Sequence, residues 1–357
     1  MLRTPVTSRQ QLDASHTGRV HTMNVLIASS IDGEAIERLE QEHQVIRAFP
    51  NSSEESLHAL IRDCEALVFR SGIRVSADLM GCAPRLKLLV RAGSGMDNLD
   101  VEYARKRGVQ LVRIPQPSAR AVAEMAFAFM LALSRRLLEA DRSMRNGRWE
   151  KHEFSGYLLR DKTLGVVGIG NTGSCVAQMG VAWGMRVIGC VQHPSREREE
   201  GFCEKGIQML EFDQVIANAD YLSIHVPLKD NTRRLLDADA LSRMKPGAYL
   251  INLARGGIVD EQALYESLTH NGGLRGAALD VHEHEGQGCM SPLAMLNNVI
   301  LTPHIGAMAI DAQREIGQKV VEIIDAFANA HGSDAWQGKV AEVAQGYTRI
   351  QGEVNRG

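Results

Sequence analysis

Short apolar runs alternate with segments of helical periodicity along most of the chain. Such runs are typical of strands buried in a parallel sheet, and the amphipathic segments between them are typical of helices. In the first third of the chain the pattern predicts strands at residues 24–28, 44–46, 66–69, 88–91 and 110–113. It predicts helices at residues 36–39, 54–61 and 101–106, and another from residue 77.

A second series of the same kind begins at Thr163. Its predicted strands are residues 164–167, 186–191, 221–226, 248–253, 276–279 and 299–301, and a final helix is predicted at residues 310–328. Alternating strands and helices favour parallel strands joined by right-handed crossovers. The sequence therefore predicts an α/β fold with two domains, each built on a parallel sheet.

Residues 119–145, between the two series, are predicted to form one long helix rich in Ala, Met, Phe and Leu. The segment Pro115-Gln116-Pro117 precedes it, and Ser118 is the expected N-cap. Its apolar surface is wider than one packing face needs. Two interpretations stay open: part of this surface packs on a second subunit, or the helix is buried between two domains of one chain.

The segment Gly168-Ile169-Gly170-Asn171-Thr172-Gly173 directly follows the predicted strand at 164–167 and has the form G-x-G-x-x-G. The three glycines serve the tight turn, the close approach of a pyrophosphate and the packing of helix on strand. The following helix would offer N–H groups and its positive dipole end to the phosphates. The alternative is a plain glycine-rich turn, but a strand, a helix and a second strand surround this segment. The sequence therefore predicts a Rossmann dinucleotide-binding domain.

Composition and charge narrow the classes of function. The chain has 357 residues and a net charge of -3, so it offers no general basic surface for nucleic acid. Its six cysteines are scattered, without a C-x-x-C pair or zinc spacing, which favours reduced thiols and no metal. Residues 1–21 lack the apolar core of a secretory signal, and no stretch has the roughly 20 apolar residues of a membrane span. We therefore expect a cytoplasmic protein without membrane or nucleic-acid partners.

Three ionisable residues stand near the carboxyl ends of strands in the second series: Arg255, Glu285 and His304. Ligands of parallel sheets bind beyond these ends. Taken singly, the arginine could be a surface charge, the glutamate part of a plain loop and the histidine structural. Taken together beside a dinucleotide turn, they favour a catalytic site.

Five stretches carry a resemblance to a known enzyme family: Arg91-Ala92-Gly93-Ser94-Gly95-Met96-Asp97-Asn98, Gly165 to Gly173, Ala254 to Glu261, Gly276 to Val281 and Leu301 to Ala307. With them, about residues 24–330 resemble the D-isomer-specific 2-hydroxyacid dehydrogenase family, closest to its D-3-phosphoglycerate dehydrogenase branch. We expect no C-terminal regulatory domain of the kind that some of these enzymes carry. The resemblance implies a flavodoxin-like substrate domain at 23–117 and 307–332, and a Rossmann NAD(P)-binding domain with a dimerisation helix at 118–306. Residues 1–22 would be a disordered extension and 333–357 a loose tail.

The resemblance also implies a role for each matching residue. Arg255 would bind the substrate carboxylate, His304 would exchange a proton with the substrate oxygen, and Glu285 would orient the imidazole. Asp280 would meet the nicotinamide amide. The residues expected at the cofactor are Gly168, Gly170, Asn171, Thr172, Gly173, Val191, Gln192, His225, Val226, Pro227, Thr232, Leu253, Ala254, Arg255, Asp280, His304, Gly306 and Ala307.

Two arginines predict a second anionic group on the substrate. Arg70 and Arg91 stand at strand ends of the first series, beside Ser94 and Gly95, whose backbone the resemblance assigns to the substrate carboxylate. Either arginine alone could be a rim charge. Together they would present two guanidinium forks, the preferred partners of phosphate or carboxylate. The resemblance to phosphoglycerate dehydrogenases points the same way.

Two positions depart from the pattern of the family. Gly286 follows Glu285 where the family usually has proline, which makes that loop more flexible and the role of the glutamate less secure. Val191 stands where an acidic residue would accept hydrogen bonds from the ribose 2′-hydroxyl. The arginines at 196 and 198 could reach a 2′-phosphate or could pair with neighbouring glutamates. We therefore expect NADP to be accepted at least comparably to NAD.

The function predicted from these observations is hydride transfer between a nicotinamide cofactor and a pair of D-2-hydroxy acid and 2-oxo acid, carried out by a homodimer. The alternative is a non-catalytic, nucleotide-sensing scaffold of the corepressor kind on the same fold. Arg255, Glu285 and His304 favour an enzyme, although fold alone does not decide between the two.

Overall fold

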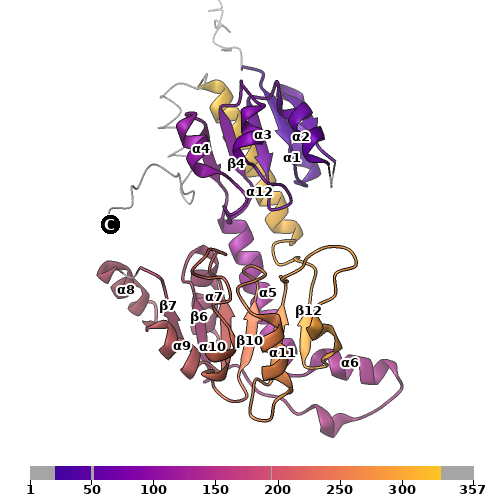
Figure 1. Ribbon diagram of the computed structural model, residues 1–357, viewed down its shortest axis with the longest axis vertical. Coiled ribbons are helices and arrows are strands. Elements are labelled where there is room, and N and C mark those ends of the chain that lie inside the picture. Colours follow the sequence, from indigo (N-terminus) through magenta and orange to yellow (C-terminus); the bar gives the residue numbers. More distant parts are fainter. Residues whose placement is uncertain (1–20, 50–51, 194, 331–357) are drawn as a thin grey trace, which may run out of the picture.

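The computed structural model describes residues 21–49, 52–193 and 195–330 of the chain. This part contains two parallel sheets with helices on their faces, one in the upper and one in the lower half of Figure 1. The predicted α/β class with two parallel sheets is confirmed. Apart from residues 21 and 22, the predicted N-terminal extension lies outside the described residues, as does the predicted tail at 333–357.

Five strands form the first sheet, in the order β2-β1-β3-β4-β5, and all of them are parallel. This is the flavodoxin-like order, which reverses between β1 and β3. The strands are β1 (Asn24–Ile27), β2 (Gln44–Arg47), β3 (Ala66–Phe69), β4 (Leu88–Arg91) and β5 (Gln110–Arg113). The helices between them are α1 (Gly33–Glu42), α2 (Glu54–Ile61), α3 (Ala77–Gly81) and α4 (Val101–Lys106). Every residue of β3 and β4 is buried, as expected of strands covered on both faces.

A helix from the far end of the described chain completes the first sheet. α12 (Ile310–Asn329) lies beside α1 in Figure 1. Its buried residues Ile316 and Val320 belong to the same core as Val25 and Val68 of the sheet. The chain therefore leaves the first sheet after β5 and returns to it only after the second sheet is complete.

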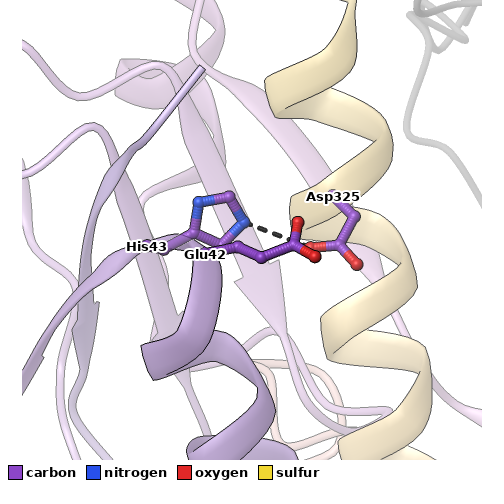
Figure 2. Close-up of side chains that lie close together, drawn as sticks. All are labelled: Glu42, His43 and Asp325. Carbon is purple, nitrogen blue, oxygen red and sulfur yellow. Dashed lines mark hydrogen bonds and ion pairs between the residues drawn. The ribbon is translucent and has the colours of Figure 1, made fainter. Parts of the chain in front are cut away.

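The ring of His43, at the end of α1, links this helix to α12 (Figure 2). Its Nε2 lies 3.1 Å from Oδ1 of Asp325, and its Nδ1 accepts a hydrogen bond from the backbone N–H of Met23 at 3.4 Å. Glu42 lies beside this pair. Because both ring nitrogens of the buried His43 already have partners, the group fastens α12 to the sheet and offers no free imidazole nitrogen to a metal.

Seven strands form the second sheet, in the order β12-β11-β10-β9-β6-β7-β8, again all parallel. The order reverses between β6 and β9, as in a Rossmann fold with one additional strand at its edge. The strands are β6 (Thr163–Val167), β7 (Arg186–Cys190), β8 (Ile207–Met209), β9 (Tyr221–Ile224), β10 (Tyr249–Asn252), β11 (Gly276–Leu279) and β12 (Val299–Leu301). The accompanying helices are α7 (Asn171–Ala182), α8 (Arg196–Cys203), α9 (Phe212–Asn218), α10 (Ala238–Ser242) and α11 (Glu261–Thr269), with short 3₁₀ helices at Lys151–Phe154 and Pro292–Met295.

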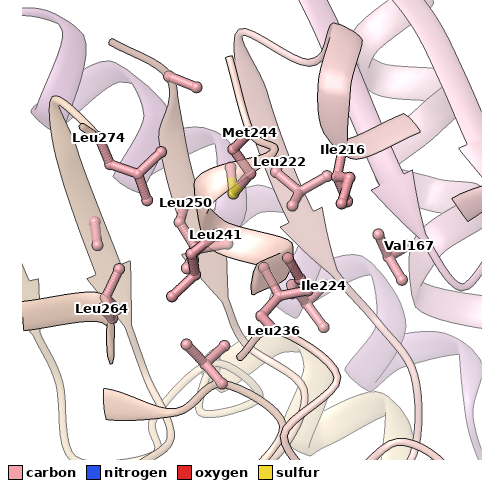
Figure 3. Packing of buried hydrophobic residues seen from close by; sticks show 14 of the residues in the cluster. Val167, Ile216, Leu222, Ile224, Leu236, Leu241, Met244, Leu250, Leu264 and Leu274 are labelled. Atoms are coloured by element: carbon pink, nitrogen blue, oxygen red, sulfur yellow. The ribbon is translucent and has the colours of Figure 1, made fainter. Parts of the chain in front are cut away.

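Apolar cores cover both faces of the second sheet. On one face, Leu222 and Leu250 pack with residues of the neighbouring helices such as Leu241 and Leu264 (Figure 3). On the other face, Met130 and other residues of the preceding helix pack against β6 and α7. The predicted strands of this series are present, but several are shorter than expected, and β8 and the helices α8–α11 were not predicted.

The long helix predicted for residues 119–145 is wrong in two respects. The segment forms two helices, α5 (Gln116–Ser134) and α6 (Leu137–Arg145), because Arg136 adopts a left-handed backbone conformation with φ of 51°. Ser118 lies inside the first turn of α5 and is not its N-cap. The apolar surface of α5 packs against α7, β10, β11 and α12, which favours the interpretation of a helix buried within one chain.

In the described residues, no helix combines the length and apolar character needed to cross a bilayer. The limits of the two domains stay a prediction.

Candidate active site

A cavity of about 530 Å³, here called the cleft, lies where the carboxyl ends of the two sheets face each other. From the side of the first sheet it is lined by Arg70, Ser71, Arg91, Ser94, Gly95, Asp97 and Arg113. From the side of the second sheet it is lined by Gly170, Asn171, Thr172, His225, Val226, Pro227, Leu253, Ala254, Arg255, Asp280, His304, Gly306 and Ala307. Most of the residues predicted for the cofactor and the substrate therefore meet in one place.

The glycine turn connects β6 with α7 at the switch point of the second sheet. Gly168 has φ of +95°, a conformation that side chains rarely adopt. A Cβ on Gly173 would lie 2.1 Å from the carbonyl oxygen of Gly168, so only glycine lets the helix start this close to the turn. By contrast, a Cβ on Gly170 would meet nothing within 4 Å, and no side chain caps α7. The N-terminal end of α7 is therefore accessible to a phosphate group.

A second cavity, of about 640 Å³, continues from the cleft along the other side of the glycine turn. Gly170, His225, Val226 and Pro227 line both this cavity and the cleft. The remaining lining of this second cavity includes Val191, Gln192, Arg198, Glu211 and Thr232. Thr232 braces the wall, because its hydroxyl donates to the carbonyl oxygen of Pro227 at 2.6 Å. Burial lowers the pKa of His225 to about 4, so its ring is neutral at pH 7, and it lies 2.8 Å from the hydroxyl of Ser223.

Asp280 holds the turn that carries His304. Its carboxylate accepts hydrogen bonds from the hydroxyl of Thr302 at 2.5 Å, from the N–H of Ile305 at 2.8 Å and from the N–H of Gly306 at 2.7 Å. Its own backbone oxygen accepts from the N–H of His304 at 2.9 Å. Asp280 thus lines the cleft and also fixes the backbone next to His304.

His304 lines the cleft and forms a pair with Glu285, which lies outside the cleft lining and lines a neighbouring cavity together with His304. The Nδ1 atom of His304 lies 3.1 Å from Oε2 of Glu285, and the other glutamate oxygen accepts from the N–H of His282 at 3.2 Å. The hydrogen bond with His304 lowers the pKa of Glu285 below its usual value, although partial burial opposes this shift. Gly286, which replaces the usual proline, has φ of +134° and leaves the glutamate in place. With Nδ1 engaged, Nε2 is the ring nitrogen available to a ligand.

Arg255 follows β10 and reaches across to the first sheet. Its Nε and Nη2 atoms donate to the two carboxylate oxygens of Asp97 at 2.9 and 2.8 Å, and its Nη1 donates to the carbonyl oxygen of Ala254 at 2.6 Å. Burial raises the pKa of Asp97, but the hydrogen bond and charge of Arg255 outweigh this effect and the net shift is downward. The guanidinium passes so close to Gly95 that no larger residue would leave it in this position.

Arg70, Arg91 and Arg113 bring three more guanidinium groups to the cleft. Arg70 donates to the side-chain oxygen of Gln313 at 2.5 Å, and Arg91 donates to the carbonyl oxygen of Gly95 at 2.7 Å. Burial, and then the charges of Arg255 and the other arginines, lower the pKa of Arg91 to about 10, against a partial compensation by Asp97. In the described part of the chain, no carboxylate lies within ion-pair distance of these three residues.

The family model for the NAD-binding domain of D-isomer specific 2-hydroxyacid dehydrogenases matches residues 127–306. A hydroxypyruvate reductase from Thermotoga maritima is 35% identical over 308 residues, which cover 86% of this chain and 97% of the relative. The chain belongs to the D-isomer specific 2-hydroxyacid dehydrogenase family. A D-3-phosphoglycerate dehydrogenase from Archaeoglobus fulgidus is 39% identical over 302 residues, 85% of this chain and 56% of the relative. This family member thus spans little more than half the length of the phosphoglycerate dehydrogenases that it matches.

Solved structures of similar fold extend the comparison. The D-lactate dehydrogenase from Aquifex aeolicus, complexed with NAD and lactic acid, has a TM-score of 0.75 and 28% identity, covering 93% of this chain and 100% of that one. An acyclic imino acid reductase in complex with NADPH and D-Arg also has a TM-score of 0.75, with 29% identity, covering 86% and 97% of the two chains. Structures of this fold therefore include complexes with either nicotinamide dinucleotide.

The residues of this family member fit such a dinucleotide. The two cavities share part of their lining and together extend from Val191 to His304. The glycine turn lies between them, and the space beside Gly170 is open. The amide of Asn171, the hydroxyl of Thr172 and the backbone N–H groups at the start of α7 are the hydrogen-bond donors available there to a phosphate group. No acidic residue occupies position 191, and Arg198 lines the end of the groove.

Two residues of the cleft, and a third residue that contacts its lining, were not singled out from the sequence. Asp97 stood in the motif around Gly95, but its pairing with Arg255 crosses 158 positions of sequence. Arg113 ends β5, and its register opposite Arg91 is the signal that could have placed it in the cleft. Gln313 lies in the predicted final helix, where nothing in the sequence marks it. Its side chain accepts a hydrogen bond from Arg70 and donates one to the carbonyl oxygen of Ala307 at 2.7 Å.

Proposed function

We propose that this chain is an NAD(P)-dependent oxidoreductase that interconverts a 2-oxo acid and a D-2-hydroxy acid. The observation that carries the proposal is that His304, paired with Glu285, lines the same cleft as Arg255 and the glycine turn. A histidine held by a carboxylate next to a guanidinium is what reduction of a carbonyl next to a carboxylate needs.

Each residue of this set would act in a defined way. Arg255 would bind the substrate carboxylate through its fork and polarise the adjoining carbonyl. The free Nε2 of His304 would donate a proton to the carbonyl oxygen during reduction and remove it during oxidation, while Glu285 keeps the ring in its orientation. A bound nicotinamide dinucleotide supplies or accepts the hydride. The backbone of Ser94 and Gly95 would hold the carboxylate from the opposite side.

The substrate we propose carries a second anionic group, such as a phosphate. The support is that Arg70 and Arg91 line the cleft without a carboxylate partner in the described residues. Losing one charge-assisted contact costs about 1.5–3 kcal/mol, or about 10- to 150-fold in affinity. Arg70→Ala and Arg91→Ala should therefore raise KM for 3-phosphohydroxypyruvate and leave KM for glyoxylate or pyruvate nearly unchanged. Equal effects on both kinds of substrate would contradict this part of the proposal.

We also propose that NADP is accepted at least comparably to NAD. Val191 supports this, because it neither accepts hydrogen bonds from a ribose hydroxyl nor repels a 2′-phosphate. Of the two arginines that follow, Arg196 pairs with Glu200 at 2.9 Å, whereas Arg198 lines the groove. Arg198 is therefore the residue we expect to meet a 2′-phosphate.

The assembly we propose is a homodimer. Because α5 is already covered within the chain, the support now comes from α6 and the segment after it. Leu137, Leu138, Met144, Trp149 and Leu158 are all at least half exposed there, which is unusual for apolar side chains gathered in one part of a chain. Isologous pairs are the commonest oligomers. Light scattering at micromolar concentration should give the mass of two chains, and a monomer would contradict the proposal.

One panel of assays tests the function itself. The purified protein is mixed with NADH or NADPH and a set of 2-oxo acids that includes glyoxylate, pyruvate, hydroxypyruvate and 3-phosphohydroxypyruvate, and the loss of reduced cofactor is followed. Turnover that falls in the variant His304→Ala supports the proposal. Tight binding of the dinucleotide without turnover of any acid would instead favour a nucleotide-sensing scaffold.

A further inference from the structure

Two polar side-chain atoms on the wall of the cleft are buried without a hydrogen-bond partner. The Nε atom of Arg113 and the hydroxyl oxygen of Ser118 both have almost no contact with solvent and no partner. Ser118 is 6% exposed as a whole residue. Both residues line the cleft. A buried polar group without a partner costs about 1–3 kcal/mol, so two of them on one cavity wall require an explanation.

The fold places these two groups in the same cavity as Arg70 and Arg91. Arg113 is the last residue of β5 and is the register partner of Arg91 on β4, so the two side chains leave the sheet on the same face. Ser118 follows in the first turn of α5, a 19-residue helix whose N-terminus has no side-chain cap. The positive end of this helix therefore adds to the potential at Ser118.

The remaining contact of Arg113 is weak. Its Nη1 lies 3.5 Å from the carbonyl oxygen of Ser94, at the limit of a hydrogen bond. Arg255, by comparison, donates hydrogen bonds to both carboxylate oxygens of Asp97. The guanidinium of Arg113 has five N–H donors and only this one marginal acceptor. It lines the same cleft as the guanidinium groups of Arg70 and Arg91, which also have no carboxylate partner among the described residues.

We propose that Arg113 and Ser118 form a specificity contact for an oxyanion group at the end of the substrate remote from its carboxylate. This inference rests on the proposed oxidoreductase function and gives a substrate contact to two residues to which the sequence assigned none. Among oxyanions, a phosphate matches the wall best, because it carries about 1.5–2 negative charges and three strong acceptor oxygens. A single carboxylate would leave more of the positive charge of Arg70, Arg91 and Arg113 uncompensated.

A purely structural role for Arg113 makes a different prediction. If the residue only supported the loop of Ser94, its loss would disturb the binding of every 2-oxo acid, because that loop is expected to meet the carboxylate that all of them share. A specificity contact affects only those substrates that carry the distal group. The ratio of kcat/KM between two substrates therefore separates the roles.

The experiment compares Arg113→Met, which keeps an unbranched flexible side chain but removes its donors, with Ser118→Ala and with the control Arg85→Met. Arg85 is an exposed arginine of the same part of the chain that does not line the cleft. Each variant is assayed with 3-phosphohydroxypyruvate, oxaloacetate and pyruvate, and its folding is checked by circular dichroism. For Arg113→Met we expect kcat/KM with the phosphorylated acid to fall by about 10- to 150-fold, and for Ser118→Ala by about 2- to 10-fold. Pyruvate should be affected little in either variant, and the control should match the parent with all three acids.

An equal loss with all three acids would overturn the inference, and an equal loss with oxaloacetate and the phosphorylated acid would overturn only the preference for phosphate. Calorimetric titration with 3-phosphoglycerate separates failure of this contact from failure of the proposed function. If the parent turns over no 2-oxo acid but binds 3-phosphoglycerate more tightly than Arg113→Met does, the contact stands and the oxidoreductase function fails. If the parent turns over these acids and Arg113→Met binds 3-phosphoglycerate as the parent does, the function stands and the contact is wrong.

Discussion

Replacing Gly95 by alanine would test whether the position of Arg255 controls turnover. A Cβ on Gly95 would lie 1.9 Å from Nη2 of Arg255, 3.2 Å from its Cζ and 2.9 Å from Oδ1 of Asp97. Atoms in van der Waals contact are about 3.5 Å apart, so the guanidinium has to move by roughly 1.5 Å. Because Nη2 is a terminal atom of a flexible side chain, the guanidinium can move without shifting the backbone, but the movement disturbs its bond with Asp97 and the alignment of the fork.

The size of the effect follows from that displacement. A misplacement of about 1 Å at a substrate-positioning group can lower the rate by about 10²-fold. The loss of one charge-assisted hydrogen bond, at about 1.5–3 kcal/mol, corresponds to about 10- to 150-fold. We therefore expect kcat/KM of Gly95→Ala for a 2-oxo acid to fall by about 10²-fold while Tm changes little.

The assay is steady-state oxidation of reduced cofactor by the best 2-oxo acid of the panel, together with thermal denaturation. Gly72→Ala is the matched control, because the added Cβ meets nothing within 4 Å although its neighbour Ser71 lines the cleft. If Gly95→Ala keeps kcat/KM within a factor of about 3, equivalent to less than 1 kcal/mol, the reasoning about Arg255 is wrong. A large loss of Tm would show instead that the guanidinium does not yield.

Four further predictions concern single residues. His304→Ala should lower kcat by about 10²–10⁴-fold with nearly unchanged affinity for the dinucleotide in fluorescence titration, and near-normal turnover would remove it from the mechanism. Arg255→Lys should lose most of kcat/KM, because a point charge cannot reproduce the planar fork, and an unchanged value would contradict its role. Val191→Asp should raise the ratio of kcat/KM for NADH over NADPH, and a strong preference of the parent for NADH would refute our interpretation of Val191. The hydrogen bond with His304 lowers the pKa of Glu285 from 4.5, so this pair stabilises the fold above about pH 4.5 and the stabilisation is lost as the pH falls through the lowered pKa. Tm of Glu285→Gln should therefore decline less steeply than Tm of the parent below that pH, and parallel curves would contradict the pairing.

The sequence predicted the parallel strands well, because a strand buried on both faces must be a continuous apolar run. β3, β4 and β5 have the predicted bounds, although β4 ends in Arg91 and β5 begins with Gln110 and ends with Arg113. The glycine turn was predicted for a similar reason. At Gly168 the backbone conformation, and at Gly173 the lack of space for a Cβ, exclude other residues, so the glycines themselves indicate the turn. Arg255 and His304 line one cleft because strand ends of parallel sheets converge on one edge, whereas the catalytic roles of these two residues and of Glu285 stay a prediction.

What the sequence did not reveal depends on contacts between distant residues. The break between α5 and α6 lies at Arg136, which is held in its left-handed conformation without a glycine or proline to announce it. Arginine at the end of a strand is common, so Arg113 became informative only through its register with Arg91 and its lack of partners. Likewise, nothing local to Asp97 indicates that its carboxylate pairs with Arg255.

The bidentate pair of Asp97 and Arg255 has a consequence for selectivity. A substrate carboxylate that reaches Arg255 does not add a new ion pair but exchanges one carboxylate for another, so its net gain in free energy is small. The guanidinium groups of Arg70, Arg91 and Arg113 have no carboxylate partner among the described residues, so an anion that reaches them would displace neutral acceptors at most and gain more. We therefore expect the cleft to select among 2-oxo acids by the part of the molecule in which they differ, and less by the carboxylate that they share.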